Sequence, residues 1–155
     1  MADYPITLSN TRSARLGNEE GLHGFTHKYT IKYSDIPATA TTATDTVTFT
    51  LGTTPALYAI DKCQVIVRTA FAGTTALAAG VGTTSSVATI SASQSVLTAG
   101  PLSGAAGSVP ANKVQGSAAI GLVSVFTNSV GGSPSAVTAG EVDIYLGIRD
   151  LSKIG

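Results

Sequence analysis

The chain has few of the residues on which catalysis and covalent cross-linking depend. Its 155 residues include no tryptophan, one cysteine and two histidines, so an intrachain disulfide is excluded. Charged residues make up 12% of the chain, against about 25% in ordinary proteins, and nine lysines and arginines balance nine acidic residues. Because binding to the phosphates of nucleic acids requires a basic surface, this balance argues against a nucleic-acid partner.

Long apolar runs are also missing. The longest apolar-looking stretch, residues 118–126, is broken by Gly121 and Ser124 and falls well short of the roughly 20 residues of a membrane helix. Residues 1–10 are polar and contain a proline, without the apolar centre of a secretory signal. We therefore expect a chain that is made in a cytoplasm and has no membrane partner.

The pattern that the chain does have is alternation, and it is clearest near the C-terminus, over residues 140–151. Apolar residues alternate there with mostly polar ones: Val142, Ile144, Leu146 and Ile148 against Asp143, Tyr145, Gly147 and Arg149. A period of two places one set on a buried face and the other toward solvent or a neighbour. The segment therefore predicts a closing β-strand with one buried face.

The same pattern recurs from residue 28 onward. Strands are predicted over residues 28–33, 46–51, 57–71, 77–81, 87–90 and 113–128. Turn signals lie at 52–55 and 131–134, one helical turn is expected at 93–97, and 99–111 is interpreted as a surface loop. Six to eight short strands without a convincing amphipathic helix predict an all-β chain, a single-domain β-sandwich or a barrel.

The first 27 residues differ from the rest and predict a separate segment, so we divide the chain into an N-terminal arm (1–27) and a β-domain (28–155). The segment holds both histidines and several charged residues, and few apolar residues recur at a fixed period. We interpret it as an extended arm that a partner could order. The alternative is a first strand over residues 4–8 that joins the sheet, because Tyr4, Ile6 and Leu8 alternate.

No constellation of catalytic or metal-binding residues stands out. His23 and His27 are the only side chains suited to act as bases at neutral pH, and the glycines around them disfavour a helix that would align them. The acids have no EF-hand spacing, and the serines have no nucleophile elbow. Glu141 and Asp143 share one strand face, which we expect to point outward and to serve solubility and edge protection. We therefore expect that the protein is not an enzyme, that it binds no cofactor, and that it has no catalytic or metal-binding residues.

The single cysteine and two of the tyrosines have simple structural interpretations. Cys63 lies in phase with Val65 and Val67, so we predict that it is a small buried core residue. Tyr58 and Tyr145 are single aromatic residues, too few for a sugar-binding platform.

Four short motifs carry a resemblance to a known family: KYTIKYSDI (28–36), VTFTLG (47–52), VIVRTAF (65–71) and AGEVDIYL (139–146). With them, residues 28–151 resemble the small capsid decoration (cement, or auxiliary) proteins of tailed bacteriophages. The resemblance implies a jelly-roll-like sandwich that forms a homotrimer on the outer capsid surface of the virion. It also implies that the chain is made in the host cytoplasm and that its partner is the major capsid protein.

Some members of that family use a terminal arm to contact the capsid. The candidate partner-binding residues are therefore those of the arm: Tyr4, Ile6, Leu8, Arg12, Arg15 and Leu16. Another virion β-module remains the alternative, such as a head fibre base, a neck or tail component, or a receptor-binding knob. A small hydrolase is a third hypothesis, for which a pair of acids in a cleft would be the sign.

Overall fold

The structure, a computed structural model, describes residues 3–7, 13–15, 25–84, 86–102, 114–128 and 132–153. It contains two β-sheets, and the predicted all-β sandwich is confirmed. Sheet A has the strand order β1–β4–β10–β6–β7, with β1 (Asp3–Thr7), β4 (Thr46–Thr53), β10 (Gly121–Asn128), β6 (Leu77–Thr83) and β7 (Ser86–Ser95). Sheet B has the order β2–β3–β11–β5–β8, with β2 (Ser13–Arg15), β3 (His27–Lys32), β11 (Ala139–Asp150), β5 (Tyr58–Ala72) and β8 (Gly100–Pro101). The short strand β9 (Val114–Gly116) also pairs with β5.

The strand order is that of a jelly roll. Apart from the β6–β7 hairpin, successive strands from β3 to β8 alternate between the sheets, and so do β10 and β11. When β9 is left aside and the eight strands from β3 to β11 are numbered along the chain, sheet B contains 1-8-3-6 and sheet A contains 2-7-4-5. This is the double Greek-key arrangement of a jelly roll. The closing strand β11 lies in the middle of sheet B, between β3 and β5.

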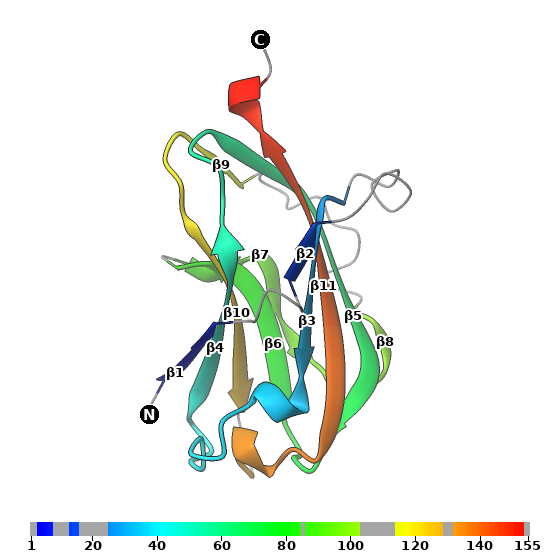
Figure 1. Ribbon diagram of the computed structural model, residues 1–155. Helices are drawn as coiled ribbons and strands as arrows, with labels where there is room; N and C mark the ends of the chain where they lie inside the picture. Colours follow the sequence, from blue (N-terminus) through cyan, green and yellow to red (C-terminus); the bar gives the residue numbers. More distant parts are fainter. Residues whose placement is uncertain are drawn as a thin grey trace.

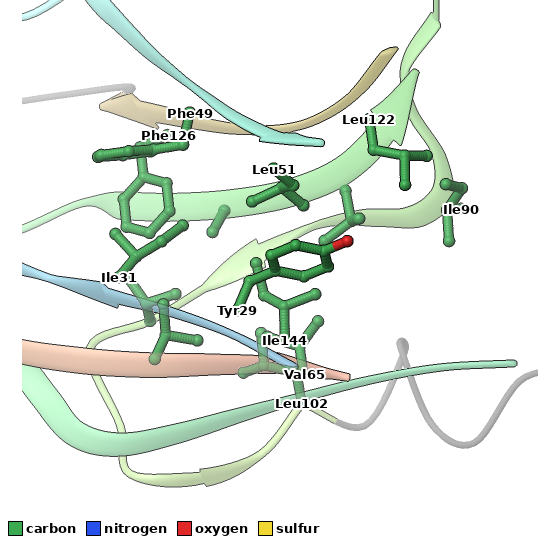
Figure 2. Packing of buried hydrophobic residues seen from close by; sticks show 14 of the residues in the cluster. Tyr29, Ile31, Phe49, Leu51, Val65, Ile90, Leu102, Leu122, Phe126 and Ile144 are labelled. Atoms are coloured by element: carbon green, nitrogen blue, oxygen red, sulfur yellow. The ribbon is translucent and has the colours of Figure 1, made fainter. Parts of the chain in front are cut away.

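Alternation along each strand fills the space between the sheets. In β4 the apolar residues Val47, Phe49 and Leu51 are buried, whereas Thr48 and Thr50 between them are half-buried on the other face. The buried side chains of the two sheets meet in the core (Figure 2). There, side chains of sheet A face side chains of sheet B: Phe49, Leu51, Leu122 and Phe126 against Tyr29, Ile31, Val65 and Ile144. Burial of these side chains supplies the main stabilisation of the sandwich.

Phe126 is the centre of an aromatic group in the core. Its ring meets Phe49 of sheet A edge-on at a centroid distance of 5.3 Å and Phe71 of sheet B at 5.6 Å. Edge-to-face pairs of this kind stabilise by about 0.5–1.5 kcal/mol beyond the area that they bury. The group therefore links the two sheets where β10, β4 and β5 approach one another.

Three sequence predictions are corrected by the fold. The helical turn expected at 93–97 is wrong, because β7 continues to Ser95 and pairs with β6. The single strand expected over 113–128 is two strands: β9 lies in sheet B, and after residues 117–120 the chain enters sheet A as β10. The loop expected at 99–111 contains the short strand β8, and Leu102 after it is buried; residues 103–111 lie outside the described residues.

The two ends of the sandwich carry different short helices. Turns of 3-10 helix at η1 (Tyr33–Asp35) and η2 (Pro134–Ala136) lie at one end, and η3 (Leu151–Lys153) lies at the other with the C-terminus (Figure 1). Within the described residues, no helix has the length and apolar character needed to cross a membrane.

Candidate functional site

The described parts of the predicted arm lie on the edges of both sheets. Strand β1 pairs in parallel with β4, in register from Asp3 opposite Thr46 to Thr7 opposite Thr50. Strand β2 pairs antiparallel with β3 on the other sheet, and β3 already begins at His27. The alternative prediction of a first strand over residues 4–8 that joins the sheet is thus confirmed for residues 4–7.

Side-chain contacts add to the backbone pairing of β1. Tyr4 and Ile6 are half-buried and pack against the core, and the Tyr4 hydroxyl donates to the Thr39 carbonyl oxygen at 2.8 Å. The Asp3 carboxylate accepts hydrogen bonds from the hydroxyls of Thr46 at 2.9 Å and Thr48 at 2.6 Å. Of the other candidate arm residues, Arg15 pairs through its backbone in β2, and Leu8, Arg12 and Leu16 lie outside the described residues.

Charge is divided unequally between the two sheets. In the strands that the structure describes, Asp3 is the only charged residue of sheet A. The strands of sheet B carry ten: Arg15, Lys28, Lys32, Asp61, Lys62, Arg68, Glu141, Asp143, Arg149 and Asp150. One face of the sandwich is therefore rich in threonine, serine and alanine, and the other is ionic.

Asp143 corrects the prediction of an exposed, edge-protecting acid. Its side chain points to the outer face of sheet B, yet the residue as a whole is only 3% exposed, and β11 is a central strand. The carboxylate accepts hydrogen bonds from the Thr30 hydroxyl at 2.7 Å and from Nε of Arg68 at 2.8 Å, and Nζ of Lys28 lies 3.4 Å away. The two neighbouring strands, β3 and β5, supply all these partners, so Asp143 is buried by a polar network.

The network shifts the pKa values of its members in a consistent direction. Burial by itself would raise the pKa of Asp143, but hydrogen bonds from Thr30 and Arg68 and the charges of Lys28 and Arg68 outweigh it and lower the pKa. Burial likewise disfavours the charged form of Lys28, but the charge of Asp143, the neighbouring Tyr145 and hydrogen bonds to both together outweigh burial and raise that pKa. The hydrogen bond to Asp143 also raises the pKa of Arg68. All three groups are thus charged at neutral pH.

Aromatic rings extend this network into a surface patch. Nη2 of Arg68 donates to the Tyr145 hydroxyl at 2.8 Å, and Nζ of Lys28 lies 5.7 Å from the centre of the Tyr145 ring. Phe25 meets Tyr145 edge-on at 5.9 Å, and Nζ of Lys62 lies 5.9 Å from the centre of the Phe25 ring. We call Phe25, Lys28, Lys62, Arg68 and Tyr145 the basic-aromatic patch.

Sequence reasoning did not find this patch. Its residues lie on three strands and the segment before β3, and Thr30 and Arg68 are separated from Asp143 by 113 and 75 positions. Alternation does indicate that Lys28 and Tyr145 point outward, but it does not indicate that they are cross-strand neighbours. Tyr58, the other single tyrosine considered, is buried at 3% exposure and forms part of the core.

The histidine and cysteine predictions can also be placed. Cys63 is 1% exposed, which confirms a core residue, and burial raises the pKa of its thiol to about 12. His27 lies in a strand, with Nδ1 at 2.7 Å from the Thr26 hydroxyl and its ring stacked on Tyr29; His23 lies outside the described residues. Among the described residues, no group of three or more histidines, cysteines and acids is placed to hold a metal ion.

A hollow of about 340 Å³ lies near η3. It is lined by His27, Thr53, Thr54, Pro55, Ile148, Asp150 and Lys153. Asp150 accepts hydrogen bonds there from the backbone N–H and the hydroxyl of Ser152, at 3.1 and 2.6 Å. Asp150 therefore caps the C-terminal turn, and the described residues that line this hollow do not include the two facing carboxylates that a glycosidase would use.

Comparisons with known proteins add little to this description. No protein-family model matches the chain, and no curated protein sequence matches it. A search of solved structures returned the crystal structure of PliG from Aeromonas hydrophila, a periplasmic lysozyme inhibitor of g-type lysozyme. The two chains are 10% identical, and the match covers 96% of this chain and 98% of that chain with a TM-score of 0.32. A likeness at that TM-score carries no argument about the role of this chain.

Proposed function

We propose that this protein is a structural component of a tailed-phage virion that decorates and reinforces the outer surface of the capsid shell, as a homotrimer. The observation that carries the proposal is the unequal division of charge between the two sheets of a jelly roll. A sheet with one charged residue can pack against other protein at little desolvation cost, because cores of protein interfaces are depleted of charge. The resemblance of the strand motifs to decoration proteins points to the same role.

Repetition makes weak contacts sufficient for such a role. A trimer that binds several shell subunits at once gains affinity through effective concentration, without a large interface on each copy. The low charge of the chain also reduces repulsion between neighbouring copies on a crowded shell.

The direct test mixes the purified protein with empty shells of the major capsid protein. Co-sedimentation and cryo-electron microscopy should show threefold density on the shell exterior, repeated over the whole surface. Density confined to the vertices of the shell would instead support another virion β-module, and no association with shells would refute the proposal.

Deletion of residues 2–7 tests the proposed role of the arm. The deletion removes β1 and leaves all eight strands of the jelly roll, so we expect a folded trimer with a far-UV circular dichroism spectrum close to the original. If the β1 part of the arm contacts the shell, the truncated protein should no longer decorate it. Full decoration by the folded, truncated protein would show that β1 has no part in binding.

A further inference from the structure

The outer face of sheet B carries an excess of positive charge around the basic-aromatic patch. Four cations lie on its strands there, Lys28, Lys32, Lys62 and Arg68, against two carboxylates, Glu141 and Asp143. The Glu141 carboxylate lies 3.7 Å from Nζ of Lys32, and Asp143 lies beneath Lys28 and Arg68. Among the described strand residues of this face the difference, four minus two, is +2, on a chain whose total charge is zero. Such a face attracts an anionic group.

The buried carboxylate fixes the position of these cations. A buried ion pair is often no more stable than apolar residues of similar size, so stability alone does not explain Asp143 at this place. What Asp143 does is hold Nε of Arg68 at 2.8 Å and Nζ of Lys28 at 3.4 Å, while Nη2 of Arg68 is held by the Tyr145 hydroxyl. The side chains of Lys28 and Arg68 remain 35% and 46% exposed. Because their rotamers are already ordered, binding of an anion would cost less side-chain entropy.

The character of the patch favours a protein carboxylate over a nucleic-acid phosphate. Tyrosine and arginine are among the residues most enriched at the energetic centres of protein interfaces, and Tyr145 and Arg68 are hydrogen-bonded to each other here. Glu141 and Asp143 lie on the same face and would repel a continuous row of phosphates. Arginine and lysine can instead take up single carboxylates between these acids.

We infer that the basic-aromatic patch binds a carboxylate-bearing segment of a partner protein. The identification of this partner as a subunit of the capsid shell rests on the proposed function. The carboxylates would lie against Arg68 and Lys62, and the aromatic pair of Phe25 and Tyr145 would pack against the apolar part of the same segment.

The first experiment tests the patch without shells. Fluorescence anisotropy of a labelled peptide of alternating glutamate and leucine is measured against the full chain at low and at moderate salt, with a labelled short DNA duplex as the comparison. Binding of the peptide that weakens with salt is expected. The variant Lys62→Glu should lower the affinity about tenfold through charge repulsion. Lys153→Glu is the matched control, because Lys153 lies on η3, is 79% exposed, and should have little effect.

The second experiment measures shell binding with the same two variants, after circular dichroism has shown that both are folded. Lys62→Glu should reduce decoration and Lys153→Glu should not. The inference is overturned if the two variants behave alike in both assays, if the peptide does not bind, or if the DNA duplex binds more tightly than the peptide. Peptide binding that depends on Lys62, in a protein that never associates with shells, would refute the proposed function and leave the patch assignment standing.

Discussion

Replacement of Asp143 by asparagine should destabilise the fold far more than replacement of Glu141 by glutamine. Glu141 lies two positions before Asp143 on the same strand. Both acids lie on the outer face of β11, but their surroundings differ. The Asp143 side chain is 4% exposed and has three polar partners, whereas the Glu141 side chain is 35% exposed and faces Lys32 at 3.7 Å. The pair of variants therefore compares the loss of one negative charge inside the network and outside it.

The expected magnitude follows from the contacts. Removal of one partner of a fully buried ion pair costs about 3–5 kcal/mol, since it leaves an uncompensated charge. Here the side chains of Lys28 and Arg68 are 35% and 46% exposed, so water can recover part of that loss, and we expect about 2 kcal/mol. For a chain of this size the loss corresponds to a fall in Tm of about 4–8 °C. The exposed pair of Glu141 and Lys32 should contribute no more than about 0.5 kcal/mol.

The network also predicts the pH dependence of stability. The pKa of Asp143 is lower in the folded protein than in the unfolded chain, so the unfolded chain binds the proton more readily. The stabilisation by Asp143 is thus complete above the unfolded pKa of about 4 and is lost as the pH falls through the lower, folded value. Below that value the stabilities of the original protein and of Asp143→Asn should converge.

Thermal and urea unfolding followed by circular dichroism can measure these differences, and dichroism suits a chain without tryptophan. All variants should be compared at one protein concentration, because association alters apparent stability. Equal losses for Asp143→Asn and Glu141→Gln would refute the reasoning, and so would a difference that persists unchanged at acid pH.

Further predictions concern the core and one strand. The Cys63 thiol is buried, and its pKa is raised to about 12. It should therefore not react with Ellman's reagent in the folded protein and should react fully in urea. Rapid reaction under native conditions would contradict its burial. Gly140 has a φ of +143°, and a Cβ there would collide with the Phe71 ring, whereas Gly100 has a φ of +127° with open space around it. Both alanine variants therefore strain the backbone, but Gly140→Ala should lose about 1–3 kcal/mol more in urea unfolding than Gly100→Ala; equal losses would show that the ring moves aside freely.

Alternation along the sequence determined the fold class and the buried face of the most regular strands. Val142, Ile144 and Leu146 are all fully buried, and Cys63 lies in the core in phase with its neighbours, as their spacing predicts. The physical reason is local, because successive side chains of a strand point to opposite faces whatever the strand pairs with. The fold class therefore followed from the residues, and the jelly-roll order agrees with the resemblance of the motifs.

Only the tertiary structure decided which strands are neighbours. It placed β1 beside β4, divided residues 113–128 between the two sheets, and made a strand of the segment expected to turn at 93–97. It also buried Asp143, which the sequence alone indicates as an exposed acid, because its partners come from strands 75 and 113 positions away. Strand pairing and register depend on the packing of the whole core, and no local pattern specifies which distant side chains will meet across a sheet.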